Sequence, residues 1–219
     1  MKIGVDEAGR GSVIGPLVVC SFASISQTEL LELGVKDSKD LSKKKREELY
    51  QILVKMPHNV IICEPKRIDN SPNLNQLEVE LFAESLSVMP DGEIMLDACD
   101  VDAARFARNV SILSKRDCEA EHKADENHPE VSAASIIAKV TRDNCVKQLC
   151  QDLKMDLGSG YPSDPKTKSA VKILSAGDYP HDCLRWSWKT VSDARGSPVP
   201  PRPGGPQQTL FSITKSPTD

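Results

Sequence analysis

The stretch that decides the fold is MKIGVDEAGRG, residues 1–11. Ile3 and Val5 alternate with small or polar neighbours, and this alternation predicts a short buried strand over residues 2–7. Successive side chains of a strand point to opposite faces, so Asp6 and Glu7 cannot share one face of a regular ladder. We expect the strand to end at these acids, with both side chains over its edge. The alternative is a strand end followed by a polar turn, in which one acid merely faces solvent.

The residues after the two acids favour a functional interpretation. Gly9 and Gly11 let the backbone turn sharply and approach a ligand closely, and Arg10 between them indicates that the ligand is an anion. Acids beside an anion-binding loop indicate a divalent metal that bridges carboxylates and phosphate.

Composition limits the class of protein. A chain of 219 residues with 39% hydrophobic and 27% charged residues forms one ordinary domain, with or without an appendage. The seven cysteines include no CxxC pair, which argues against a zinc site, and their odd number argues against a disulfide framework. No signal-like start and no apolar run of about 18 residues occurs. We therefore expect a soluble, cytoplasmic protein without membrane contact, in which Cys20, Cys63 and Cys99 are core residues.

The net charge of −4 does not by itself predict a nucleic-acid binder. A metal bound among acids inverts their local field, however, so the positions of basic residues say more about nucleic-acid binding than the net charge does.

Residues 1–153 alternate between apolar runs and amphipathic stretches, which predicts an α/β fold with a mixed sheet flanked by helices. The expected strands are 2–7, 17–25, 59–64, 93–98 and 109–113, and the expected helices are 42–55, 74–88, 102–108 and 130–153. A short connection joins the first two strands, so we expect an antiparallel hairpin. Residues 154–193 predict a small helical appendage, and the Pro- and Gly-rich residues 194–219 a disordered tail.

Two further acids join the first pair as candidate metal ligands. Asp97 ends the apolar run 93–98 and is expected near Asp6, because ligands gather beyond the carboxyl ends of strands. Asp125 directly precedes the helix that begins near Pro129. Carboxylate oxygens suit Mg²⁺ or Mn²⁺ better than zinc, so we interpret His122 and His128 as structural residues or as residues that support the metal ligands. Asp100 and Asp102 follow Asp97 closely, and a helix cap explains them best.

Basic and aromatic residues further along the chain suit a nucleic acid. Ser135, Lys139 and Arg142 recur at i, i+4 and i+7 of one helix, a polar stripe that fits either a phosphate backbone or a solvated face. Tyr161 stands between Gly160 and Pro162, where its ring either stacks on a sugar or base or packs on the core.

The chain resembles the type 2 ribonuclease H family, RNase HII, over roughly residues 1–193, and its archaeal members above all. The resemblance rests on five blocks in family order: VDEAGRGSVIGPLV, DSKDLS with the following REEL, LDACDVDAARF, EHKADENHPEVSAASIIAKVTRD and GSGYPSDPKT. It implies an RNase H-like mixed sheet flanked by helices. It also implies that four catalytic carboxylates hold two divalent cations, Mg²⁺ or Mn²⁺: Asp6, Glu7, Asp97 and Asp125. LDACDVD supplies three acids, so Asp100 is an alternative third ligand, although strand position and the family pattern favour Asp97.

The family pattern also marks residues that touch the nucleic acid. In relatives the GRG motif contacts the ribonucleotide 2′-hydroxyl and nearby phosphates, the tyrosine packs against a sugar, and three cations lie near phosphates. The matching positions are Gly9, Arg10, Gly11, Tyr161, Lys39, Lys139 and Arg142. The implied reaction is two-metal hydrolysis of the RNA strand of RNA–DNA hybrids, with incision 5′ of ribonucleotides embedded in duplex DNA, giving 5′-phosphate and 3′-hydroxyl ends. The alternatives are a resolvase-like nuclease of the same superfold and a non-catalytic hybrid-binding clamp adaptor.

The tail carries a second motif. QQTLFSI, residues 207–213, resembles the motif that binds the sliding clamp PCNA, with Gln207, Leu210 and Ile213 as docking residues and Phe211 in an altered register. That motif usually ends in aromatics, and here Ile213 and Thr214 stand in their place. A tail that only aids solubility is the alternative. We expect the enzyme itself to be a monomer.

Overall fold

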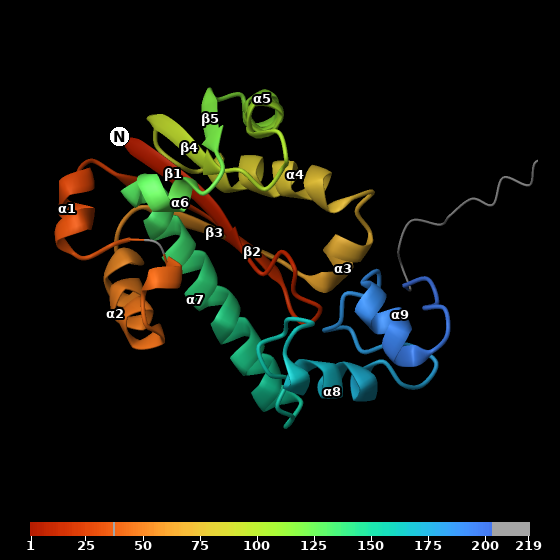
Figure 1. Cartoon of the computed structure of the whole chain (residues 1–219). Helices are drawn as coiled ribbons and strands as arrows, with labels where there is room; N and C mark the ends of the chain where they lie inside the picture. Colours follow the sequence, from red (N-terminus) through yellow and green to blue (C-terminus); the bar gives the residue numbers. More distant parts are fainter. Residues whose placement is uncertain (37, 203–219) are drawn as a thin grey trace, which may run out of the picture.

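The structure, a computed structural model, describes residues 1–36 and 38–202. Within them one five-stranded sheet has the order β3-β2-β1-β4-β5 (Figure 1). Its strands are β1 (Lys2–Ala8), β2 (Leu17–Ser24), β3 (His58–Cys63), β4 (Glu93–Asp97) and β5 (Cys118–Glu121). β2 is antiparallel to both β1 and β3, whereas β4 is parallel to both β1 and β5. The predicted hairpin and the mixed sheet are both confirmed.

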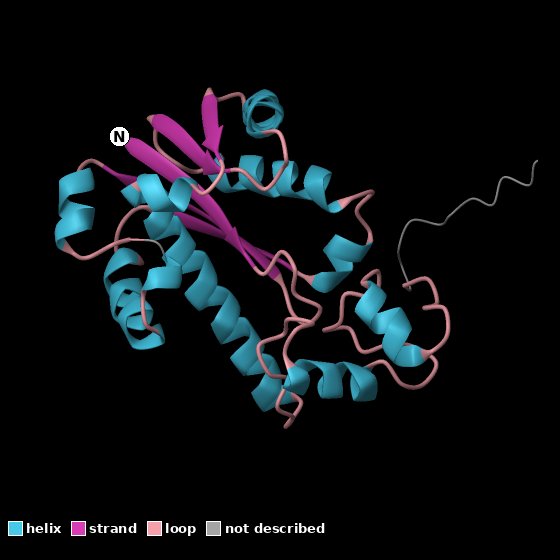
Figure 2. Cartoon of the chain, viewed as in Figure 1, coloured by secondary structure: helices cyan, strands magenta, loops and turns pink. Residues whose placement is uncertain are grey.

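Helices flank this sheet, as Figure 2 shows. The flanking helices are α1 (Gln27–Glu32), α2 (Lys43–Leu53), α3 (Pro65–Asp69), α4 (Leu74–Leu86), α5 (Ala103–Ser114), α6 (Ala124–Asn127) and α7 (Pro129–Asp152), with a 3₁₀ turn at Ser38–Asp40. α8 (Pro165–Leu174) and α9 (Lys189–Arg195) lie apart from the sheet, beyond the end of α7 (Figure 2). The side chains of Ser42 and Asp102 accept hydrogen bonds from backbone N–H groups at the starts of α2 and α5. Both are therefore N-caps, and the cap predicted for the Asp100–Asp102 stretch is Asp102.

Strand periodicity builds two cores, one on each face of the sheet. On β2, Val18, Cys20 and Phe22 pack with α1, α2 and α7, whereas Leu17 and Val19 pack with α4 and α5. α7 approaches β1 closely because Gly4 has no side chain: a Cβ there would lie 2.3 Å from the Val131 nitrogen. This close packing brings the start of α7, with the segment before it, against the middle of the sheet.

One predicted strand is wrong. Residues 109–113 form the second half of α5, and the fifth strand is Cys118–Glu121 instead. The apolar residues of NVSIL suggested a strand, but Val110 continues a helical stripe begun by Phe106 and Ala107, all three of which are buried. The true strand, CEAE, lies at the sheet edge and is only partly buried. Its sequence therefore lacks the apolar alternation of the other strands.

The region after α7 packs around a third core. Val13 and Ile14 of the β1–β2 loop meet Val171 of α8, Val191 of α9 and the segment around Trp186 there. Packing extends past position 194, where the tail was predicted to begin, because Arg202 forms an ion pair with Asp69. Within the described part of the chain, every helix is too short or too polar to cross a membrane.

Candidate active site

Strand register brings the first two acids together. β1 and β4 are parallel and pair Val5 with Leu96. The next residues of the two strands, Asp6 and Asp97, consequently lie side by side at the carboxyl edge of the sheet. The sequence prediction that Asp97 lies near Asp6 is confirmed.

Asp125 completes a group of three carboxylates. It lies on α6, the single turn before α7, and each of Asp6, Asp97 and Asp125 offers an oxygen within 4.8 Å of the others. The backbone N–H of Ala124 donates to Asp97 Oδ1 at 3.0 Å, which fixes α6 to the end of β4. Lys39 reaches the same group, since its Nζ lies 3.1 Å from Asp125 Oδ2. The Lys39 ammonium group therefore lies beside the three converging acids.

Glu7 lies on the opposite face of β1. We expected the strand to end at the acids, and this prediction is wrong: β1 stays paired with β2 as far as Ala8. Adjacent residues of the ladder point to opposite faces, so Asp6 turns toward α7 and Glu7 toward α4. There Glu7 lies within 4.8 Å of Glu78 and Cys99, and the Cys99 thiol donates to Glu7 Oε2 at 3.4 Å. The two acids therefore reach the same sheet edge from different sides.

Burial and mutual repulsion raise the proton affinity of these acids. The pKa of Asp6 lies well above its usual value because the carboxyl is buried and because Glu7 and Asp97 lie close, although a hydrogen bond from Ser135 opposes this. The pKa of Asp97 rises to about 6, through burial first and then the charge of Glu7. Carboxylates held together in this way repel one another until a cation neutralises them.

The donor set fits a hard divalent cation. Asp6, Asp97 and Asp125 supply only carboxylate oxygens, the ligands that Mg²⁺ and Mn²⁺ prefer. Asp100, the alternative third ligand, is instead held by Arg105, whose Nε lies 3.0 Å from Asp100 Oδ2. The choice of Asp97 over Asp100 therefore agrees with the geometry.

The GRG loop follows β1 directly and lies beside the acids. Gly9 needs to be glycine, because its φ is +90° and a Cβ would lie 2.9 Å from the Pro16 carbonyl oxygen. Gly11 is different: a Cβ there meets no atom within 4 Å. The Arg10 side chain turns toward α4, where Nε donates to Glu78 Oε1 at 2.8 Å and Nη2 to Asn75 Oδ1 at 2.9 Å.

The predicted polar stripe of α7 is mostly buried. The hydroxyls of Ser135 and Ser38 lie 3.0 Å apart, and Lys139 is half-buried. Arg142 is only 2% exposed and donates to Ser12 Oγ at 2.8 Å, while its guanidinium lies 4.5 Å from the centre of the Tyr161 ring. The arginine thus joins the GRG loop to the tyrosine segment.

Sequence reasoning missed Glu78, the partner of Arg10. Its carboxylate is fully buried, and burial together with the charge of Glu7 raises its pKa to about 7, although Arg10 opposes the rise. A signal was available: Glu78 lies three or four positions from Leu74, Leu81 and Phe82, on the apolar face of α4. A carboxylate on such a face calls for a buried cation as its partner.

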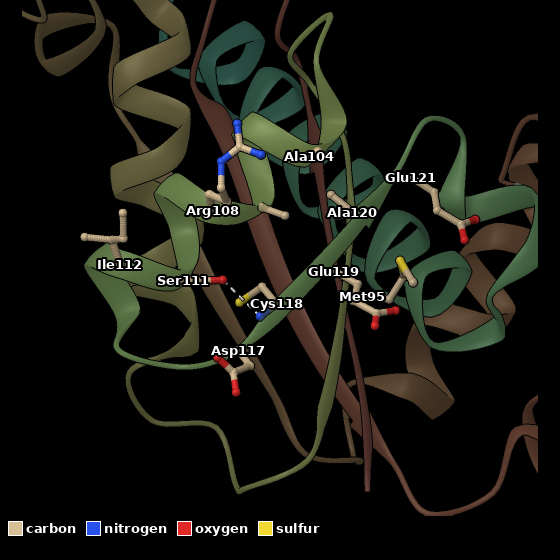
Figure 3. A pocket seen from close by; sticks show the side chains of 11 residues that line it. Met95, Ala104, Arg108, Ser111, Ile112, Asp117, Cys118, Glu119, Ala120 and Glu121 are labelled. Carbon is tan, nitrogen blue, oxygen red and sulfur yellow. Dashed lines mark hydrogen bonds between the residues drawn. The ribbon is translucent and has the colours of Figure 1, made fainter.

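Another hollow lies away from these residues. A cavity of about 700 Å³ opens between α5 and the edge strand β5 and is lined by Arg108, Ser111, Ile112 and Cys118, among others (Figure 3). It contains none of the acids described above and none of the GRG loop.

Converging acids at a sheet edge, beside a glycine–arginine loop, form the site of a metal-dependent nuclease. The model of the family described as Ribonuclease HII matches residues 3–191, and the chain belongs to that family. A ribonuclease HII from Pyrobaculum arsenaticum is 44% identical over 193 residues, 86% of this chain and 94% of that protein.

Solved structures agree with this assignment. Ribonuclease H2 from Pyrococcus horikoshii matches with a TM-score of 0.81 at 40% identity, over 89% of this chain and 97% of that one. The PCNA:RNase HII complex from Archaeoglobus fulgidus also gives 0.81 at 40% identity, over 86% and 95%. The chain is thus a ribonuclease H, a metal-dependent endonuclease with an RNase H-like fold. The predicted family, fold class and enzyme class are confirmed.

Proposed function

We propose that the enzyme hydrolyses the RNA strand of RNA–DNA hybrids and incises 5′ of ribonucleotides embedded in duplex DNA. Asp6, Glu7, Asp97 and Asp125 hold two divalent cations, Mg²⁺ or Mn²⁺. When bound, the two cations supply an activated water and stabilise the leaving 3′-oxygen during in-line displacement. The products are 5′-phosphate and 3′-hydroxyl ends.

Each acid has a distinct part in holding the metal. Asp6 and Asp97 come from adjacent strands, and Asp125 approaches from α6. Glu7 lies on the other face of β1, in a separate group with Glu78 and Cys99, and its proposed part is to add an oxygen from the side of α4. The observation that carries the proposal is the convergence of Asp6, Asp97 and Asp125 within 4.8 Å of one another, because carboxylates this close repel one another and a divalent cation between them relieves that repulsion.

The neighbouring loop and tyrosine supply recognition of the substrate. Gly9, Arg10 and Gly11 contact the 2′-hydroxyl, the group that distinguishes RNA from DNA. Tyr161 packs against the sugar at the junction, and its ring is held by the Arg142 guanidinium. Lys39 and Lys139 are the proposed phosphate contacts, and the position of Lys39 beside the acids supports its part, since its Nζ lies 3.1 Å from Asp125 Oδ2.

The direct test uses a labelled DNA duplex with one ribonucleotide, beside an all-DNA duplex and a long RNA–DNA hybrid. We expect cleavage on the 5′ side of the ribonucleotide with Mg²⁺ or Mn²⁺, none in EDTA, and none of the all-DNA duplex. Asp6→Asn and Glu7→Gln should remove most turnover and leave the fold intact. Cleavage of the long hybrid alone would leave the metal chemistry standing and remove the junction role of the GRG loop and Tyr161. Wild-type rates in the variants would reject the metal cage.

We further propose that the tail binds a PCNA sliding clamp. The structurally similar ribonuclease HII from Archaeoglobus fulgidus was solved as a complex with PCNA. Gln207, Leu210, Phe211 and Ile213, the predicted docking residues, lie outside the described part of the chain. Deleting residues 204–219 should abolish co-elution with the clamp and spare cleavage, and unchanged co-elution would reject the proposal.

The expected setting follows from the same chemistry. We propose a monomer that acts in the cytoplasm, where its cysteines stay reduced. All seven cysteines are free thiols in the structure, which supports a reducing compartment. Sedimentation of the enzyme without its clamp should give the mass of a single chain, and a dimer would overturn that part of the proposal.

A further inference from the structure

Arg185 is a fully buried arginine beneath the GRG loop. It is 0% exposed, and its guanidinium donates only to backbone carbonyls of the β1–β2 connection. Nη2 lies 2.7 Å from the Gly9 oxygen, Nη1 2.9 Å from the Arg10 oxygen, and Nε 3.2 Å from the Gly15 oxygen. One side chain thus holds both ends of the loop.

The residues around Arg185 fix its position independently. Its backbone N–H donates to the Val13 carbonyl at 3.0 Å, and the Gly15 N–H donates to the Cys183 carbonyl at 2.9 Å. Ile14 and Leu184 form an isolated antiparallel bridge between these bonds. The indole ring of Trp188 covers the guanidinium, with its centre 4.9 Å from the Arg185 Cζ. The C-terminal region therefore pairs with the loop as a short extra strand would.

The charge of Arg185 has no acidic partner. Among residues 1–36 and 38–202, Arg185 forms no ion pair with a carboxylate, and burial together with the nearby Arg142 lowers its pKa to about 10. An unpaired buried cation is costly, and stability alone would favour an apolar residue there. Hydrogen bonds to three carbonyl oxygens of the β1–β2 connection offset the cost of burying this charge.

The planarity of the peptide bond gives these contacts a consequence on the other side of the loop. In a trans peptide the carbonyl of one residue and the N–H of the next point in opposite directions. When Arg185 draws the carbonyls of Gly9 and Arg10 inward, the N–H groups of Arg10 and Gly11 must face away from it. Neither N–H donates to another residue within the described part of the chain. Gly11 is exposed and has open space where a Cβ would be.

We propose that Arg185 is the positioning residue of ribonucleotide recognition: from the C-terminal region it turns the backbone N–H groups of Arg10 and Gly11 outward, as donors to the 2′-hydroxyl and its phosphate. The proposal rests on the proposed junction specificity of the GRG loop. It gives residues 154–202 a part in the site, because the loop that reads the sugar is held by a side chain from that region.

The test compares Arg185→Lys and Trp188→Leu with the wild type. Lysine keeps the charge but cannot bond three carbonyls in one fork, and Trp188→Leu removes the covering ring without leaving a buried charge unpaired. The matched control is Arg195→Lys: Arg195 also donates to carbonyls, those of Ser175 and Gly177, but within the C-terminal region itself. We would measure three quantities for each protein: kcat/KM at a single ribonucleotide, affinity in EDTA for duplexes with and without that ribonucleotide, and hydrogen exchange of the Ser12 and Gly15 amides, which donate to the Gly9 and Cys183 carbonyls.

We expect Arg185→Lys to lower kcat/KM at the ribonucleotide by about 10- to 100-fold, as a displacement of about 1 Å in a recognition element does. Its preference for the ribonucleotide duplex should fall toward one, with unchanged affinity for all-DNA duplex and faster exchange of the Ser12 and Gly15 amides. Trp188→Leu should show the same pattern more weakly, and Arg195→Lys should not show it. Equal weakening on both duplexes, or the same effect in Arg195→Lys, would reduce Arg185 to a structural role and overturn the proposal.

Two outcomes of this experiment distinguish a failure of this proposal from a failure of the proposed function. A wild-type enzyme without preference for a ribonucleotide would remove junction recognition itself, whatever Arg185 does. A wild-type preference that survives in both Arg185→Lys and Trp188→Leu would leave junction recognition standing and reject Arg185 as its positioning residue. If Arg185→Lys does not fold, Trp188→Leu decides between the two outcomes.

Discussion

Replacing Asp97 by asparagine should stabilise the metal-free protein while removing its activity. Folding raises the pKa of the Asp97 carboxyl from 3.8 to about 6, so its ionised form is less stable in the folded chain than in the unfolded one. Two pKa units correspond to about 3 kcal/mol. Because Asp97 is only partly buried, solvent screening reduces the gain to about 1–2 kcal/mol. Asparagine avoids this cost and can still accept the hydrogen bond from the Ala124 N–H.

The sign of the effect fixes its pH dependence. A carboxyl whose pKa is raised on folding costs nothing below about pH 3, where it is protonated in both states. The cost grows between pH 3 and 6 and is complete above pH 6. The advantage of Asp97→Asn should therefore be largest at pH 8, fall to about half at pH 5 and about a fifth at pH 4, and vanish near pH 3.

Urea unfolding in EDTA at pH 8 and pH 5 measures this difference. The control is Asp91→Asn, which removes an exposed acid just before β4 and should change the free energy of unfolding by less than about 0.5 kcal/mol. At pH 8 the gain of Asp97→Asn corresponds to a rise in melting temperature of about 2–8 °C for a chain of this size. A variant no more stable than the wild type at pH 8 would refute the reasoning that burial and the neighbouring acids destabilise the ionised Asp97 carboxylate in the absence of metal.

Three further predictions follow from the same geometry. Mg²⁺ should raise the wild-type melting temperature more at pH 8 than at pH 5, because protons compete for Asp6 and Asp97, whose pKa values are raised; equal shifts at the two pH values would contradict this. Gly11→Ala should leave the free energy of unfolding within about 0.5 kcal/mol of the wild type, since a Cβ there meets no atom, yet lower kcat/KM at a ribonucleotide; unchanged cleavage would show that the substrate does not approach Gly11. Glu78→Gln should weaken the hydrogen bond that positions the Arg10 side chain and raise KM about tenfold. A wild-type KM in this variant would show that Glu78 has no part in substrate recognition.

The residues of the candidate site were predictable where strand order and local sequence decide the geometry. Asp6 and Asp97 each end an apolar run, and parallel pairing of those two strands is enough to bring them together. The orientation of Glu7 was not predictable in the same way. Whether β1 ends at the acids or continues depends on its partner, and β2 keeps β1 paired through Ala8.

Partners distant in sequence explain what local patterns missed. Arg142 belongs to a polar stripe that suggests exposure, but Ser12 and Tyr161 cover it. Both partners lie outside α7, so the sequence of the helix gives no sign of them. Arg185 has no local signal at all, because its three carbonyl partners lie about 170 positions away. The same limit explains NVSIL: the β-branched residues near Val110 suggest a strand, and only packing of Phe106 and Val110 on α4 and the sheet shows the helix.

Direct measurement of metal binding tests the central claim, that these acids form the metal site. Mn²⁺ would be titrated into the wild type and into Asp6→Asn, Asp97→Asn and Asp125→Asn, with bound ion followed by electron paramagnetic resonance. Asp100→Asn is the matched control, because Asp100 is a carboxylate three positions from Asp97 that Arg105 already holds. We predict that the first three variants lose most bound Mn²⁺ and that Asp100→Asn binds it like the wild type. Wild-type binding in Asp6→Asn, or loss in Asp100→Asn alone, would contradict the account.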